Sequence, residues 1–324
     1  VSGIGTTYSG GSVRVSGGSS DFQSGGVLVQ SPTSAVSTGS IKIESGDAGV
    51  DSGSVSIRSG VSVSGPSGTI SIESGSSTSG SGASTLIGAG TALAMNGVGG
   101  EVTIKSGSGS TGGDISIVSG RGTSGQAGSI LIESGSSSSN TGGEVIINGG
   151  SSESSSNGGS TTIRSGSSHG RGGELHLSSG DSESRSGGVE LFSGSGVVSG
   201  DISIRTGASF DGTSGSVLIS TSSGSSSGEI ALSVGDSSQT GGSILLDAGE
   251  GQSLGGMILV NAGASRNGNG GNVNVISGST LADASLSGMV VVETSQSKGS
   301  TGDVSIRTGS SEMLASGSLK LSTG

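Results

Sequence analysis

The sequence has no cysteine, no tryptophan and only two prolines, and its aromatic residues are one tyrosine and three phenylalanines in 324 residues. The absence of cysteine excludes disulfide bonds and thiolate metal sites. The scarcity of large side chains argues against ordinary globular cores. No apolar run approaches the roughly 18 residues of a membrane span. Positive charge is also scarce: 13 lysines and arginines face 24 acidic residues, for a net charge of −11, which disfavours nucleic acid as a partner.

Glycine and serine dominate what is present, with 71 and 84 residues respectively. Such a composition is typical of disordered linkers. Here, however, 28% of the residues are hydrophobic, and they recur at regular intervals instead of being scattered. This order argues against a linker, because disordered segments have low hydrophobicity and no periodic pattern.

The regular unit runs glycine, polar residue, apolar–x–apolar, x, small residue, glycine, as in "GTISIESG" (68–75), "GDISIVSG" (113–120) and "GSILIESG" (128–135). We find 22 copies, spaced by about 14.6 residues on average. The first position of the apolar pair falls at Val13, Val27, Ile41, Val55, Ile70, Thr85, Val102, Ile115, Ile130, Val145, Thr161, Leu175, Val189, Ile202, Val217, Ile230, Ile244, Ile258, Val273, Val290, Val304 and Leu319.

The apolar residues alternate, which is the period of a β-strand, and valine and isoleucine favour strands. The flanking glycines are expected to supply positive φ or tight corners. We therefore predict an all-β fold without helices: a single-stack parallel β-solenoid of about 22 coils, each of roughly 14–15 residues, over 1–324. The coils near 85–101 and 273–289 are expected to be irregular. An antiparallel meander of hairpins is the alternative, and the asymmetry between strong segments and serine-rich arms favours the solenoid.

Stacking of the coils would bring their aliphatic residues together in an internal ladder. Each coil buries about two aliphatics, worth ~3–5 kcal/mol before entropy, whereas ordering its residues costs more, so no coil can fold alone. The internal ladder is predicted to contain Val55, Ile57, Ile70, Ile72, Ile115, Ile117, Ile130 and Ile132.

Stacking in register also predicts a charge ladder on the outer face, with Arg58 between Glu44 and Glu73 of the adjacent coils. The alternative is that these three charges are solvated and unpaired. No capping helix shields the ends of the array, so the rod is expected to continue into further repeats or to stack end to end with another copy.

No catalytic constellation emerges, and we predict that the chain is not an enzyme. "GSSSG" (224–228) and "GSGSTG" (107–112) match a nucleophile and a dinucleotide motif, but neither precedes a helix. His169 and His176 lack a third ligand for a transition metal. No cofactor is expected apart from weakly bound calcium. The acidic residues that begin several segments supply its candidate ligands: Asp114, Glu144, Glu174 and Asp201.

Strings such as "GGDISIVSGRGTSGQAGSILIESG" (112–135) resemble the serine- and glycine-rich repeat arrays of very large predicted cell-surface proteins of marine microalgae, diatoms among them. The resemblance covers nearly the whole chain. It implies an extracellular or cell-surface location and a structural role, and it transfers no catalytic residues.

We therefore expect a structural extracellular rod or filament segment that self-associates. The serine-rich arms could carry O-linked sugar. An ice-binding solenoid is one alternative, although the outward middle positions (Ser56, Leu86, His176 and others) are too mixed to form a uniform hydroxyl face. A multivalent adhesin for glycans or surfaces is the other, and it would have to bind without an aromatic platform.

Overall fold

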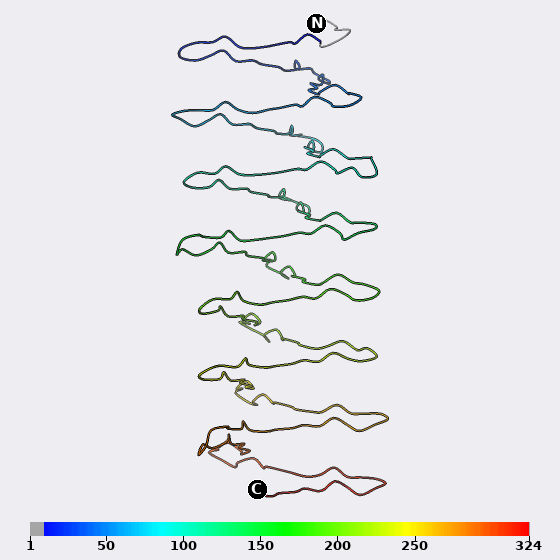
Figure 1. Cartoon of the computed structure of the whole chain (residues 1–324), viewed down its shortest axis with the longest axis vertical. Coiled ribbons are helices and arrows are strands. Elements are labelled where there is room, and N and C mark those ends of the chain that lie inside the picture. The colour runs from blue at the N-terminus through cyan, green and yellow to red at the C-terminus, as the bar shows by residue number, and fades with distance from the viewer. Residues whose placement is uncertain (1–9, 324) are drawn as a thin grey trace. The chain divides into compact units, whose positions relative to one another are not determined.

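The computed structural model describes residues 10–323, and this part of the chain contains neither a helix nor a strand. The backbone consists of extended runs that alternate with bends and short curls (Figure 1). Residues 10–323 therefore include no helix that could cross a membrane. The chain divides into two units, Val1–Arg164 and Ser165–Gly324, and copies of the repeat occur in both.

The predicted β-solenoid is wrong. The described residues form no strand and therefore no ladder of strands, and none of their side chains is buried, so no interior exists. The eight aliphatic residues expected in the internal ladder are all half exposed or more, from Ile70 at 50% to Ile72 at 70%. The physical reason is that two aliphatics per repeat offset only part of the entropy of ordering 14 or 15 residues, and no stacking supplies the rest. The alternative meander of paired hairpins is absent from residues 10–323 for the same reason.

The repeat is nevertheless present in the backbone. Bends occur in 21 places among the described residues, one in every interval between consecutive copies, for example at 63–65, 123–125 and 266–268. Each copy thus consists of an extended segment, such as 113–120, followed by a connecting loop, such as 121–127. Serine and glycine fill the loops because small residues tolerate the tight backbone path.

Many of these loops are closed by one backbone hydrogen bond, which we call the closing hydrogen bond. The glycine that starts a segment donates its N–H to the carbonyl oxygen of the residue that ended the previous segment. Gly128 donates to Gly120 over 2.9 Å and Gly143 donates to Gly135 over 2.8 Å. Eleven glycine–glycine bonds of this kind, 2.7–3.2 Å long, occur in the described chain.

Glycine avoids crowding at the start of several segments. A Cβ on Gly143 would lie 3.2 Å from Ser134 Cβ and 3.3 Å from the backbone of Gly135, tighter than ordinary contacts. The single copy that starts with another residue, Ala83, has the longest closing hydrogen bond, 3.4 Å to Gly75. The flanking glycines were expected to supply positive φ or tight corners. None of the described glycines has positive φ, so the first of these two roles does not occur there.

The residue that precedes the end of a segment decides whether the closing hydrogen bond can form. Wherever the bond is present, that residue is glycine, alanine or serine, as Ser119 and Ala248 illustrate. Five described copies that are followed by another copy have a β-branched residue there, and none of them has the bond: Thr206, Thr221, Val234, Thr294 and Thr308. A γ-methyl of these side chains faces the next starting glycine, most closely at Val234, whose Cγ1 lies 2.8 Å from a Cβ built on Gly242. Four copies with serine also lack the bond, so a small residue permits closure without ensuring it.

The loops are shaped at one further position, seven residues after the first apolar position of the segment. In most copies this residue is serine or threonine, and its hydroxyl accepts a hydrogen bond from a bend N–H. Ser137 accepts from Asn140 over 2.9 Å, and Ser265 accepts from Gly268 over 2.9 Å. In five copies the position is glycine, and a Cβ there would crowd a carbonyl oxygen of the bend. A Cβ on Gly122, for example, would lie only 2.3 Å from the carbonyl oxygen of Gly125. Serine and threonine stabilise such turns through their hydroxyl groups.

The two copies expected to be irregular absorb their extra residues in the loop. Each has a backbone-bonded turn, with Gly97 donating to Ala94 over 2.9 Å and Ser285 donating to Ala282 over 3.4 Å. The second turn contains Ala284, the one non-glycine residue with positive φ (62°) in the described chain. Both loops still end in closing hydrogen bonds of 2.8 Å, between Gly100 and Gly90 and between Gly288 and Gly278.

Candidate functional site

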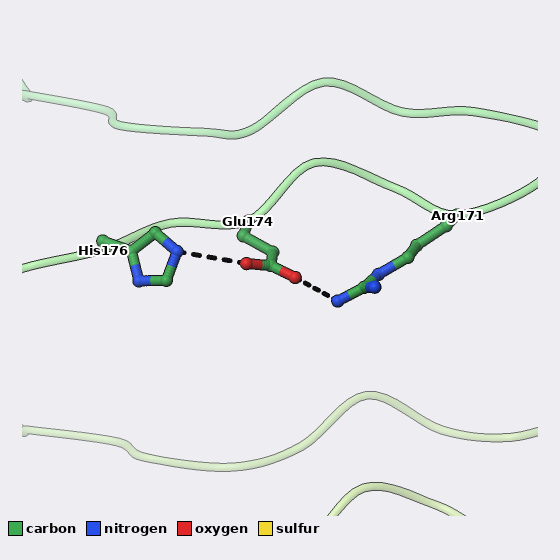
Figure 2. Close-up of polar contacts among 3 residues, drawn as sticks. All are labelled: Arg171, Glu174 and His176. Atoms are coloured by element: carbon green, nitrogen blue, oxygen red, sulfur yellow. Dashed lines mark hydrogen bonds and ion pairs between the residues drawn. The ribbon is translucent and has the colours of Figure 1, made fainter.

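The most connected polar cluster in the described chain lies at the start of segment 173–180, and Figure 2 shows its three side chains. Glu174 is at the centre. Its Oε1 pairs with a guanidinium nitrogen of Arg171, and its Oε2 lies 3.1 Å from Nε2 of His176. Arg171 belongs to the preceding loop, whereas Glu174 and His176 belong to the segment itself.

Extended backbone geometry explains why Glu174 meets His176, since residues i and i+2 share one face of an extended chain. The same spacing recurs in other segments: Lys42 pairs with Glu44, Ser71 donates to Glu73 over 2.8 Å, and Thr103 donates to Glu101 over 2.6 Å. In these segments, a polar side chain therefore contacts the next polar side chain on the same face of its own segment.

The three side chains of the cluster lie open to solvent. The side chains of Arg171 and His176 are more than four-fifths exposed and that of Glu174 is about half exposed, so water screens all three. Within residues 10–323, Glu174 is the one side chain that contacts the histidine ring through a polar atom, and His176 is exposed. A hollow lined by Leu321, Ser322 and Thr323 is open to solvent and carries no titratable side chain. The arrangement presents exposed charges of both signs to solvent.

The four calcium candidates stand on four different segments. Within residues 10–323, no three histidine, aspartate or glutamate side chains come together in a way that could hold a metal ion. Glu174 is engaged by Arg171, whose positive charge competes with a cation. Asp114, Glu144 and Asp201 make no side-chain hydrogen bond or ion pair in the described chain. Each could supply one carboxylate, far short of the six to eight oxygens that calcium takes.

The residues of the predicted charge ladder have other neighbours. Glu44 pairs with Lys42 of its own segment and Glu73 accepts a hydrogen bond from Ser71. No ion pair of the described residues includes Arg58. The ladder itself stays a prediction.

Sequence reasoning missed two structural signals. One is the small or β-branched residue that governs the closing hydrogen bond, and the other is the hydroxyl or glycine position of the loop. Both signals recur at fixed places in the repeat, so aligning the 22 copies on their first apolar position would have revealed them.

Comparison with known proteins gives no relative for this arrangement. No protein-family model, no curated protein and no solved structure matches the chain.

Proposed function

We propose that this chain is a structural, self-associating segment of an extracellular or cell-surface filament or coat. The observation that carries the proposal is the exposure of its apolar residues. The accessible surface is 32722 Å² for 30.2 kDa. Scaling relations give about 12,000 Å² for a folded monomer of that mass and about 44,000 Å² for an extended chain. A single molecule of this chain therefore keeps most of its apolar surface in contact with water.

Apolar surface in water favours association, because burial of each exposed aliphatic side chain contributes up to about 1.5–3 kcal/mol. The extended segments repeat one chemistry: two aliphatics on one face, small polar residues beside them, and glycine at the ends. Many weak, identical contacts along one chain combine into strong association. This repetition supports a structural role, in which the identical segments of one chain contact the identical segments of other chains.

The location and any modification of the chain belong to the same proposal. The resemblance to cell-surface repeat arrays of marine microalgae supports a position outside the cell. Serine-rich loops such as 136–140 are exposed and could carry O-linked sugar, which would keep the loops solvated while the segments associate.

The proposal is tested by sedimentation velocity and far-ultraviolet circular dichroism over a wide range of chain concentrations, at low and at high salt. We expect the mass to rise with concentration and β-structure to appear with it. High salt should strengthen association, because it screens the net charge of −11 and favours apolar burial. A constant monomer mass and an unchanged spectrum under all conditions would refute the proposal.

A pair of variants locates the surface that associates. The segment variant carries Ile57→Ser, Ile72→Ser, Ile117→Ser and Ile132→Ser. The loop variant carries the same number of aliphatic-to-serine changes at exposed loop positions: Leu254→Ser, Leu281→Ser, Leu286→Ser and Leu314→Ser. We expect the segment variant to associate more weakly than the loop variant. Equal effects would show that general hydrophobicity drives association and that the segments do not.

A further inference from the structure

Three segments carry a charge pattern that the other copies lack. An acidic residue precedes the first aliphatic and a basic residue follows the second, as Glu101 and Lys105, Asp201 and Arg205, and Asp303 and Arg307. The segments are 100–107 ("GEVTIKSG"), 200–207 ("GDISIRTG") and 302–309 ("GDVSIRTG"). In sequence they recur at every seventh copy.

These charges and the aliphatics between them face solvent. Glu101 is the one member of the six described charged residues with a side-chain partner, since it accepts a hydrogen bond from Thr103 of its own segment. All six charged residues are exposed, and none has an oppositely charged neighbour in the described chain. The aliphatics are exposed as well: Val102 and Ile104 at 51% and 68%, Ile202 and Ile204 at 49% and 69%, and Val304 and Ile306 at 52% and 67%.

The backbone of the three segments is also unpaired. Residues 101–106, 201–206 and 303–308 make no backbone–backbone hydrogen bond within the part of the chain that the structure describes. An extended run with free N–H and C=O groups is a template for pairing with another strand.

The charge pattern determines the direction of such pairing. When two identical segments pair antiparallel about their middle residue, the acidic position of each lies opposite the basic position of the other. The two aliphatics also lie opposite each other. Each pair of segments then has two opposite-charge contacts and two aliphatic contacts between its strands. Parallel pairing in register would instead place acid opposite acid and base opposite base, which is destabilising.

We propose that segments 100–107, 200–207 and 302–309 are the pairing sites between two copies of this chain, joined as antiparallel strands. The inference rests on the proposed self-association and names the segments and the direction of pairing. Other segments fit less well: Glu174 has no basic residue four positions later and is held by Arg171 and His176. The segment 215–222 carries no charge at all. Three sites on one chain give the association avidity.

Charge reversal tests the proposal in the full chain. The reversed variant carries Lys105→Glu, Arg205→Glu and Arg307→Glu, which places acid opposite acid at all three sites. The matched control carries Arg121→Glu, Arg185→Glu and Arg266→Glu, three exposed loop arginines whose replacement changes the net charge by the same amount. The swapped variant adds Glu101→Lys, Asp201→Lys and Asp303→Lys to the reversed variant, which restores opposite charges and the original net charge of the chain.

We expect the apparent association constant, measured by sedimentation equilibrium, to fall on the order of tenfold more in the reversed variant than in the control. The swapped variant should associate like the wild type. Equal weakening of the reversed and control variants, or a swapped variant that stays as weak as the reversed one, would overturn the pairing sites while leaving self-association intact. A wild-type chain that remains monomeric throughout would instead refute the proposed function itself.

Discussion

Replacing Ser119 with valine should break the closing hydrogen bond between Gly128 and Gly120. In the wild type the bond is 2.9 Å long, and Ser119 Cβ lies 3.4 Å from where a Cβ on Gly128 would be. A γ-methyl on residue 119 would fill the remaining gap, as Val234 Cγ1 does beside Gly242. The methyl group then occupies the space beside Gly128, and we expect the bond to be lost, as it is in the copy with Val234.

The cost follows from the exposure of the loop. A hydrogen bond that water can replace contributes about 1 kcal/mol net, so its loss should speed amide exchange at Gly128 roughly fivefold. Exchange is measured by NMR in dilute solution, where copies stay apart. Gly128 is nine residues from the substitution, so its intrinsic exchange rate does not change.

Ser119→Ala is the matched control, because Ala89, Ala248 and Ala262 precede closing hydrogen bonds of 2.8–2.9 Å. The converse change, Val234→Ala, should create a closing hydrogen bond from Gly242 to Gly235 and slow exchange at Gly242. If Ser119→Val and Ser119→Ala exchange at the same rate at Gly128, the steric explanation of loop closure is wrong.

Three further predictions concern other parts of the repeat. Ala83→Gly should shorten the 3.4 Å bond to Gly75 and slow amide exchange at residue 83 a few-fold after correction for the intrinsic rate of glycine; unchanged protection would contradict the spatial role of the starting glycine. Ser137→Ala should speed exchange at Asn140 a few-fold, whereas Ser137→Thr should preserve it because Thr280 accepts a bend N–H in another loop; similar exchange in both variants would show that the hydroxyl does not hold the bend. Calorimetric titration with calcium should show no saturable binding up to about 1 mM, since each candidate carboxylate stands on its own segment; saturable binding that Asp114→Asn removes would reveal a site formed between segments.

The sequence predicted the local organisation of the chain better than its fold. The alternation of apolar residues is visible as exposure: in segment 128–135, Ile130 and Ile132 are 51% and 67% exposed, whereas Leu131 between them is 82% exposed. The first apolar positions also divide the chain into copies, and the backbone bends between each copy and the next. These features depend on neighbouring residues, which the sequence places directly.

The solenoid could not be derived from the same pattern because it depends on contacts between copies. Ile115 and Ile117 have the right spacing for a strand, but their burial requires another segment, and one segment buries too little to hold another in place. The charged cluster was missed for a related reason. Arg171 lies in a loop and Glu174 lies in the following segment. The bend at 169–171 brings them together, and the pattern of apolar residues does not predict the shape of this bend.

The loops of the two longest copies have a consequence for engineering. Gly90 and Gly100 are ten residues apart and Gly107 and Gly113 only six, yet their closing hydrogen bonds are 2.8 and 2.9 Å long. The closure of a loop is thus insensitive to its length, in keeping with the slow growth of loop entropy with added residues. We expect foreign peptides grafted at 94–96 or 282–284 to leave the closing hydrogen bonds of these two loops in place. A chain built in this way can gain or lose loop residues and still keep the alternation of apolar residues within its segments.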